Sequence, residues 1–254
     1  MKRVLVTICG RAGSKGFRNK NLKSFCGLPM VYYSLSAVEL FAAACPQLQV
    51  DVCLNTDSAE LAQLVAEKYP EVVYLPRGEA LCGDTVPKEA VYQDCMLRME
   101  QRTGQTYDCL IDLDITSPLR QAQDLVQAMA VFESEPGLDL VLSAAPSRRN
   151  PYFNMGRLDA QGYFCRIIEN TFTARQQAPV CYDVNASLYI FARDFILGEG
   201  AQDLWEGKLR VYEMADTGIL DIDSEEDHRM MEVIGGYLYE NVEGFAAVRR
   251  NIRT

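Results

Sequence analysis

The sequence predicts an α/β protein in which a parallel sheet is wrapped by helices. Short apolar strand patterns alternate with helical patterns of about ten to fifteen residues, which is the order that βαβ units produce. Polar or glycine-rich loops follow the strands, and in parallel sheets such loops gather at the carboxyl edge, where ligands bind. The fold class therefore also indicates where a functional site should lie.

The first element is an apolar, β-branched run at residues 4–9, typical of a strand buried on both faces. A loop with Gly10, Gly13 and Gly16 follows immediately. Five cations lie in and just after that loop: Arg11, Lys15, Arg18, Lys20 and Lys23. Glycines let backbone N–H groups close around a ligand, so the strand and loop together predict a phosphate-binding site.

The remaining elements follow in the same rhythm. Pro29 begins a helix rich in alanine and leucine, and polar residues 55–58 can cap the helix after the second strand. The other predicted strands cover 50–54, 72–75, 109–113, 138–145, 184–192 and 208–214. The predicted helices cover 29–45, 59–68, 87–102, 123–134 and 224–238.

The rhythm is interrupted at residues 147–180, which mix arginines, aromatics and two glycine-containing turns without a helical period. We expect an irregular or β-rich insertion there, serving as a lid or as an arm for dimerisation. No internal repeat or low-complexity linker divides the chain, so residues 1–254 are expected to form a single domain carrying this insertion.

Composition excludes several classes of protein. The chain has 254 residues, a net charge of −10 and 48% hydrophobic residues. No apolar run approaches the ~20 residues that span a bilayer, and a pI near 4.7 argues against a nucleic-acid binder. The 9 cysteines form no Cys-x-x-Cys pair, which favours reduced thiols in the cytoplasm over disulfides or zinc. The positive charge of the first loop is therefore local and suits a small polyanion.

The first loop matches neither common phosphate motif. A Walker A loop needs Gly-Lys-Ser/Thr entering a helix, whereas Ser14-Lys15-Gly16 continues into a basic, extended segment. The glycines are spaced three apart, which also fails the dinucleotide fingerprint. The alternative is a surface loop with solvated cations.

Asp221 and Asp223 form the second candidate site. Two carboxylates at i and i+2 of an extended segment point to the same side, which suits a divalent cation shared with phosphates. The spacing of Ser224 and Asp227 equally suits a helix cap, where acidic residues gather for electrostatic reasons. The single histidine, His228, lies one turn into that helix, and a histidine-based acid–base mechanism is not expected.

Several motifs occur together and in order along nearly the whole chain. They are GRAGSKGFRNKN from Gly10, GDT from Gly83, TSPLR from Thr116, RQQ from Arg175, NASLYIF from Asn185 and DIDSEED from Asp221. In this set and order the chain resembles the acylneuraminate cytidylyltransferases, which are the CMP-sialic acid synthetases and their relatives for bacterial nine-carbon keto sugars.

The resemblance implies a Rossmann-like, three-layer fold with a mostly parallel sheet flanked by helices and a small insertion used for homodimerisation. It implies an Mg²⁺-dependent transfer of CMP from CTP to the anomeric hydroxyl of a nine-carbon 2-keto-3-deoxy sugar acid, releasing pyrophosphate. Whether one metal ion or two take part stays open.

The resemblance also implies roles for individual residues. Those implied around the nucleotide are Arg11, Ala12, Gly13, Ser14, Lys15, Lys20, Asn21, Arg77, Asp84 and Thr85. Those implied around the sugar are Asp114, Thr116, Ser117, Arg175, Gln176, Asp183 and Asn185. Asp221 and Asp223 would carry Mg²⁺, and with Arg11, Lys15 and Lys20 they form the expected catalytic set.

Three positions depart from the sialic-acid enzymes of that family. Asp114-Ile115 precedes Thr116 where a glutamine is typical, Ala186 stands where a glycine often follows the asparagine, and Asp183 stands where bacterial relatives often carry arginine. Two carboxylates beside a sugar carboxylate cost binding energy unless another group offsets them. The acceptor is therefore as well explained by legionaminic acid, pseudaminic acid or a deaminated analogue as by N-acetylneuraminic acid.

Two other functions remain open from sequence. The first is nucleotidyl transfer to an eight-carbon keto acid or to a sugar phosphate. A second cationic cluster could serve a phosphorylated acceptor: Arg148, Arg149, Arg166 and Arg175. The second is a nucleotide-binding protein without catalytic activity.

Overall fold

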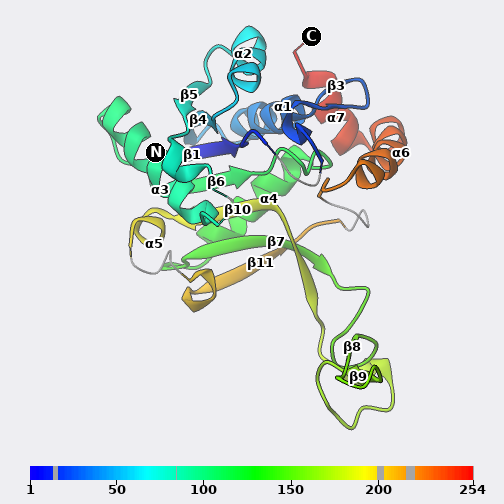
Figure 1. Cartoon of the computed structure of the whole chain (residues 1–254). Coiled ribbons are helices and arrows are strands. Elements are labelled where there is room, and N and C mark those ends of the chain that lie inside the picture. The colour runs from blue at the N-terminus through cyan, green and yellow to red at the C-terminus, as the bar shows by residue number, and fades with distance from the viewer. Residues whose placement is uncertain (14–16, 84, 199–202, 216–220, 254) are drawn as a thin grey trace.

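The structure is a computed structural model that describes residues 1–13, 17–83, 85–198, 203–215 and 221–253. Its centre is a twisted sheet with helices on both faces (Figure 1). The described strands of this sheet are β1 (Lys2–Cys9), β4 (Leu48–Thr56), β5 (Val73–Pro76), β6 (Cys109–Leu113), β7 (Leu140–Pro146), β10 (Tyr182–Ala192) and β11 (Leu209–Glu213). The main helices are α1 (Met30–Ala44), α2 (Ala59–Lys68), α3 (Lys88–Thr103), α4 (Ala122–Glu133), α5 (Arg193–Leu197), α6 (Glu225–Asn241) and α7 (Glu243–Asn251).

The core has two sides, because side chains alternate across each buried strand. On β1, Val4, Val6 and Ile8 face the helices α1, α2, α4 and α7, whereas Leu5 faces α3 and α5. All four of these side chains are fully buried. The predicted three-layer α/β class is confirmed. Within the described helices, none combines the length and the apolar character that crossing a bilayer requires.

The strand order is β11-β7-β10-β6-β1-β4-β5. β1 pairs in parallel with β4 on one side and with β6 on the other, so the chain turns to opposite sides of β1 in succession. Such a reversal opens a crevice at the carboxyl end of the central strand. The fold thus places the glycine-rich loop after β1 at the expected ligand site.

One strand departs from the parallel arrangement that the sequence pattern predicted. β10 is antiparallel to both β6 and β7. Its direction follows from its connection: the chain leaves the sheet at Pro146 and returns beside it at Tyr182. Neighbouring strands joined at the same edge of a sheet must run in opposite directions.

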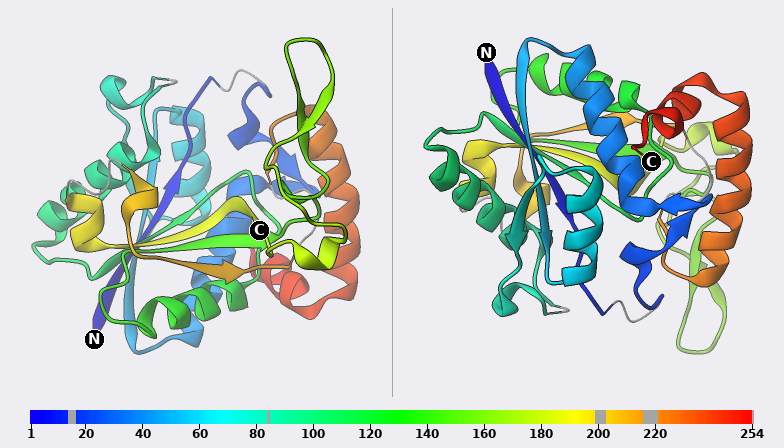
Figure 2. Two further views of the ribbon diagram at one scale, coloured as in Figure 1. Left: turned by 90° about the horizontal axis from the view of Figure 1, so that it is seen from below. Right: turned by 90° about the horizontal axis from the view of Figure 1, so that it is seen from above.

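The insertion between β7 and β10 forms an arm that projects from the body (Figure 1). It carries the short strands β8 (Gly156–Leu158) and β9 (Phe164–Arg166) and one turn of 3₁₀-helix, η3 (Arg175–Gln177). Figure 2 shows the N-terminus and this arm at opposite ends of the molecule from two directions. Because β7 runs in the same direction as β1, the arm leaves from the edge of the sheet where β1 also ends.

Side-chain caps mark the start of some helices. Ser58 Oγ accepts from the Leu61 amide at the start of α2, and Ser224 and Asp227 form a reciprocal capping box at the start of α6. The sequence patterns did not predict α7 or the small hairpin of β2 (Ser24–Phe25) and β3 (Leu28–Pro29). Both are short, and packing against neighbouring helices such as α1 and α6 stabilises them.

Candidate active site

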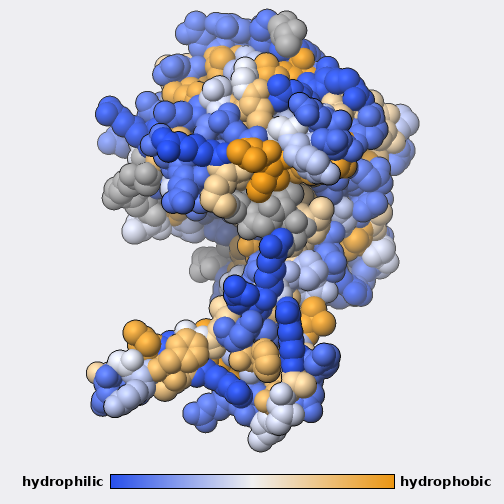
Figure 3. All heavy atoms as spheres, turned by 90° about the vertical axis from the view of Figure 1, so that its right-hand side faces the viewer, coloured by the Kyte–Doolittle hydropathy of each residue, from blue (hydrophilic) through white to orange (hydrophobic). Residues whose placement is uncertain are grey.

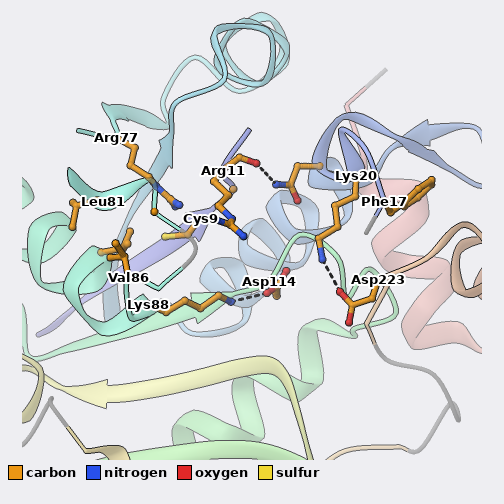
Figure 4. A pocket seen from close by; sticks show the side chains of 14 residues that line it. Cys9, Arg11, Phe17, Lys20, Arg77, Leu81, Val86, Lys88, Asp114 and Asp223 are labelled. Carbon is orange, nitrogen blue, oxygen red and sulfur yellow. Dashed lines mark hydrogen bonds and ion pairs between the residues drawn. The ribbon is translucent and has the colours of Figure 1, made fainter. Parts of the chain in front are cut away.

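A cleft of about 530 Å³ opens at the carboxyl end of β1 (Figure 4). It lies between the loop after β1, the segment that follows β5 and the first turn of α3. Its described lining is Cys9, Gly10, Arg11, Phe17, Lys20, Asn21, Arg77, Leu81, Gly83, Val86, Lys88, Val91, Asp114 and Asp223. Side chains from the two ends of the sequence therefore face one space.

The start of the glycine-rich loop is packed against its neighbours. A Cβ on Gly10 would lie 2.8 Å from Ile115 Cδ1, so only glycine fits there without movement. The Gly10 amide donates to the Asn55 carbonyl at 3.1 Å, and Asn21 Nδ2 donates to the Arg11 carbonyl at 3.1 Å. These contacts hold the Arg11 backbone at the rim of the cleft.

Further along the loop, Gly13 adopts a left-handed conformation with φ +77°, which glycine tolerates best. The Ala12 amide already donates to Asp57 Oδ1 at 2.6 Å, so a phosphate at that amide would have to displace a carboxylate. Thr85 is exposed at the rim. The predicted nucleotide ligands Ser14, Lys15 and Asp84 lie outside the described residues.

Lys20 joins the two ends of the chain. Its ammonium donates to Asp223 Oδ1 at 2.9 Å and to the Ile222 carbonyl at 3.2 Å. The helix-cap interpretation of this acidic stretch is confirmed, because Ser224 and Asp227 cap α6. Asp223 lies outside the helix, and its role as a metal ligand stays a prediction. Figure 4 shows Lys20 and Asp223 meeting on one side of the cleft.

Asp221 lies beside Asp223 but is more enclosed. Burial raises the pKa of Asp221 to about 6, while a hydrogen bond from Ser117 Oγ to its Oδ1 opposes that shift. Two carboxylates fit a magnesium ion, which commonly takes one or two protein carboxylates and completes its shell with water and substrate phosphates. Within the described residues, no group of three or more histidine, cysteine, aspartate or glutamate side chains could enclose a metal.

The opposite side of the cleft is formed by Arg77 and an apolar wall. Arg77 Nε donates to Asn55 Oδ1 at 2.6 Å, and a second guanidinium nitrogen donates to the Asn55 carbonyl at 3.2 Å. Leu81, Val86 and Val91 line the wall. A fixed guanidinium beside apolar side chains suits a planar polar ring such as a nucleobase.

The floor carries a charge cluster that the sequence interpretation missed in part. Lys88 Nζ lies 2.7 Å from Asp114 Oδ2 and 3.9 Å from Asp112 Oδ2. Burial raises the pKa of Asp112. Burial alone would do the same to Asp114, but the Lys88 ammonium and the Thr116 hydrogen bonds hold the pKa of Asp114 below its usual value. Lys88 begins α3, where the positive end of the helix dipole disfavours a cation. A lysine at that unfavourable position was the one feature of the sequence that could have indicated this charge cluster.

Buried hydrogen bonds from Thr116 and Arg120 hold the turn after β6. Thr116 donates from its amide and its hydroxyl to Asp114 Oδ1 at 2.9 and 2.8 Å. Arg120, only 1% exposed, donates to Ser34 Oγ, to the Asp114 carbonyl and to the hydroxyl and carbonyl of Ser187. The arginine of the TSPLR motif thus ties the end of β6 to α1 and β10.

The residues predicted for the sugar do not all meet in one place. Asp114 lines the cleft, and Thr116 and Ser117 are buried just behind it. Asn185 is buried in β10, where its Oδ1 accepts from Ser143 Oγ at 2.6 Å. The others lie away from the cleft, with Asp183 exposed near the start of β10 and Arg175 and Gln176 exposed on the arm.

Ala186 stands where the sialic-acid enzymes often have glycine, and its backbone conformation bears on that difference. It has φ 50° at the point where the pairing of β10 with β7 shifts register. A glycine would adopt this left-handed conformation without steric cost. The backbone shape is therefore present although the glycine is not.

Comparison with known proteins identifies the family of this chain. A family model described as cytidylyltransferase matches residues 5–128, which contain the glycine-rich loop, Arg77 and Asp114. CMP-N,N'-diacetyllegionaminic acid synthase of Campylobacter jejuni is 37% identical over 92% of this chain and 95% of its own length. The chain belongs to the cytidylyltransferase family. It is a nucleotidyltransferase by descent, as the resemblance implied.

Two further likenesses concern this cytidylyltransferase. A post-translational flagellin modification protein B of Campylobacter coli is 37% identical over 92% of this chain and 95% of its own. The solved structure of CMP:2-keto-3-deoxy-manno-octonic acid synthetase complexed with CTP has a TM-score of 0.66, with 16% identity, covering 93% of this chain and 99% of that one. The structural likeness supports the fold.

Proposed function

We propose that this cytidylyltransferase transfers CMP from CTP to the anomeric hydroxyl of a free nine-carbon 2-keto-3-deoxy sugar acid. The observation that carries the proposal is the cleft itself, which is lined by the cations Arg11 and Lys20 and by the carboxylates Asp114 and Asp223. Cations suit a triphosphate, and carboxylates suit a metal and the hydroxyls of a sugar. The shared 37% identity with a CMP-sugar acid synthase supports the same chemistry.

The reaction exchanges one phosphorus–oxygen bond for another. The anomeric oxygen bonds to the α-phosphorus, the bond from that phosphorus to the β-bridging oxygen breaks, and the hydroxyl proton passes to solvent. Pyrophosphate leaves with the electron pair. Such a displacement needs alignment and charge neutralisation more than a covalent nucleophile. Arg11 and Lys20 would offset the charge of the leaving pyrophosphate.

Asp221 and Asp223 would hold Mg²⁺. When bound, the ion would neutralise phosphate charge and polarise the reacting phosphoryl group. In the metal-free chain, Lys20 contributes the positive charge beside Asp223, with its ammonium 2.9 Å from Oδ1. Binding of a nucleotide would draw Lys20 to phosphate and leave Asp223 to the metal.

The deciding experiment measures pyrophosphate release from CTP and Mg²⁺ with a panel of acceptors. N,N'-diacetyllegionaminic acid comes first, because the 37% identical synthase of Campylobacter jejuni is named for it. Pseudaminic acid, N-acetylneuraminic acid, an eight-carbon keto acid and a sugar phosphate complete the panel. We expect turnover with a nine-carbon acid. A folded chain that is silent with all of them contradicts the proposal.

The alternative with a phosphorylated acceptor is less well supported by position. Arg148, Arg149, Arg166 and Arg175 lie on the arm, and none of them lines the cleft. A clear preference for the sugar phosphate in the same panel would reverse this conclusion. Binding of CTP without turnover on any acceptor would favour a non-catalytic role.

We further propose that the chain works as a homodimer in the cytoplasm, with the arm as the contact surface. The arm exposes large apolar side chains, and Leu158, Tyr163 and Phe164 are each about two-thirds or more exposed. Figure 3 shows apolar surface interspersed with hydrophilic surface on the projecting lower part of the molecule. The cysteines all lie in the described part of the chain and each is a free thiol, which suits a reducing compartment.

The dimer is tested by light scattering on the wild-type chain and on a Tyr163→Ser, Phe164→Ser variant. We expect a dimer that dissociates in the variant, because desolvation of these two aromatic side chains would be lost. A monomer at micromolar concentration in the wild type contradicts this part of the proposal.

A further inference from the structure

Lys88 occupies a position in the cleft that its own helix does not favour. It is the first residue of α3, directly after the N-cap Pro87. Its side chain extends beneath Cys9 to Asp114 (Figure 4). A cation in the first turn is disfavoured by the positive end of the helix dipole, by about 0.3–1 kcal/mol at an exposed site. Some other interaction must favour lysine there.

The two carboxylates near Lys88 have hydrogen-bond donors of their own. Asp112 accepts from Thr7 Oγ1 at 2.9 Å and from Tyr92 OH at 2.7 Å. Asp114 accepts twice from Thr116 through Oδ1, which fixes the turn after β6. Neither carboxylate would be left without a partner if Lys88 were absent. Their negative charge, by contrast, has no other cation as close among the described ion pairs.

The ammonium is aimed into the cleft. A lysine has three N–H donors, and the described contacts of Lys88 use one of them on Asp114. About 46% of the side chain is exposed, and Lys88 lines the cleft. Burial would lower the pKa of Lys88, but Asp114 and Asp112 outweigh it and raise the pKa, so the group stays charged.

The position of the ammonium along the cleft identifies what it can reach. Arg77, Leu81 and Val86 lie on one side of it, where a nucleoside would bind. Lys20 and Asp223 lie beyond it on the other side, where the outer phosphates and the metal would bind, and the Arg11 guanidinium lies between these two groups of residues (Figure 4). The group of CTP that lies between a nucleoside and its outer phosphates is the α-phosphate.

We propose that Lys88 donates a charge-assisted hydrogen bond to a non-bridging oxygen of the α-phosphate, the phosphate that is transferred. This inference rests on the proposed function for its nucleotide. Asp114 and Asp112 act as the support that holds the ammonium in place. The contact would strengthen as charge shifts among the oxygens during transfer, so Lys88 would serve both binding and rate.

The test separates this contact from simple neutralisation of Asp114. Lys88→Met alone leaves the Asp114 carboxylate without its cation, and the protein could fail to fold. The double variant Lys88→Met, Asp114→Asn removes both charges at once and keeps the shape and the Thr116 hydrogen bonds. Lys2→Met, at the opposite edge of the sheet and paired with Glu133 at 2.9 Å, is the matched control.

The first readout is binding, without catalysis. Calorimetry compares CMP with cytidine, which differ only in the α-phosphate. We expect the preference for CMP to fall about 10-fold or more in the double variant, since a hydrogen bond to a charged group is worth about 1.5–3 kcal/mol. The control should keep the wild-type ratio. An unchanged ratio in the double variant overturns the inference.

The second readout is turnover with the acceptor found by the panel. We expect kcat of the double variant to lie about 100-fold below that of Asp114→Asn alone, the loss seen when a transition-state donor is removed. Wild-type kcat in the double variant shows that Lys88 only balanced Asp114 and refutes the contact. If the wild type binds CMP but transfers it to no acceptor, the proposed function fails while the CMP-to-cytidine ratio still decides the role of Lys88. If the wild type does not prefer CMP to cytidine, the α-phosphate contact is refuted directly.

Discussion

Replacing Arg120 by methionine should be among the most destabilising single changes in this protein. The guanidinium is 1% exposed and donates to Ser34 Oγ at 3.2 Å, to Ser187 Oγ at 3.1 Å, to the Asp114 carbonyl at 3.2 Å and to the Ser187 carbonyl. Methionine fills a similar volume but donates nothing, and it leaves the nearby Asp124 and Asp114 carboxylates without this cation.

The magnitude follows from these contacts. A hydrogen bond from a charged donor contributes about 1.5–3 kcal/mol, and two of the acceptors are buried carbonyls. Those carbonyls keep weaker donors, since Ser34 Oγ also reaches the Asp114 carbonyl at 3.3 Å and the Asp114 amide reaches the Ser187 carbonyl at 3.4 Å. Removing one partner of a buried charged network costs about 3–5 kcal/mol, and we expect a loss in that range. A typical domain has only about 5–15 kcal/mol to lose.

The measurement is urea unfolding followed by far-ultraviolet circular dichroism. Arg229→Met is the control, because Arg229 pairs with Glu225 at 2.8 Å on the exposed face of α6 and should contribute less than about 0.5 kcal/mol. A loss below about 1 kcal/mol for Arg120→Met, with an unchanged dependence on urea, would refute the reasoning that this network joins β6, α1 and β10.

Three smaller predictions concern the site and its surroundings. Lys20→Met should strengthen binding of Mn²⁺ to the nucleotide-free chain about 10-fold, because the ammonium no longer competes with the metal for Asp223. The affinity is measured by electron paramagnetic resonance titration, with Lys23→Met as the control. Equal Mn²⁺ affinities in the two variants would contradict competition between Lys20 and the metal. Ala186→Gly should leave the free energy of unfolding unchanged or raise it by up to about 1 kcal/mol, because the steric strain of alanine at φ 50° is relieved and this outweighs the added freedom of the unfolded chain. Thermal unfolding measures the change, and a loss of about 1 kcal/mol or more would contradict the strain at Ala186. The pKa of Asp221 is raised to about 6 by burial, so the folded chain holds a proton that the unfolded chain has lost, and this group makes stability fall as pH rises from about 4 to about 6. Asp221→Asn should therefore stabilise the metal-free chain relative to wild type at pH 7 but not at pH 4, and an equal difference at both pH values would argue against a raised pKa.

Local patterns in the sequence predicted more of the architecture than of the site. The run Val4–Cys9 and the glycines after it predicted both the first strand and the loop that opens the cleft. The capping box of Ser224 and Asp227 could also be predicted from the sequence, because it depends on two residues only three positions apart. In each case the physical cause lies within one or two turns of chain, so a linear pattern can record it.

The direction of β10 could not be predicted in the same way. An apolar alternating run predicts a strand but says nothing about its partners. The arm that returns the chain beside β7 decides that β10 is antiparallel, and it was recognisable only as a break in the rhythm. For the same reason, the roles suggested for Arg175 and Gln176 remain predictions, since they lie on the arm and not in the cleft.

By itself, the sequence determined the fold class and the family, since both depend on local periodicity and on short motifs along the chain. It also predicted the loop at which a ligand would bind. Only the tertiary structure decided which charges meet. Lys20 reaches Asp223 across 203 positions, Lys88 reaches Asp114 across 26, and Arg120 reaches Ser187 across 67. Coulombic and hydrogen-bond energies depend on distance in space and on exclusion of water, and neither quantity exists until the strands have paired.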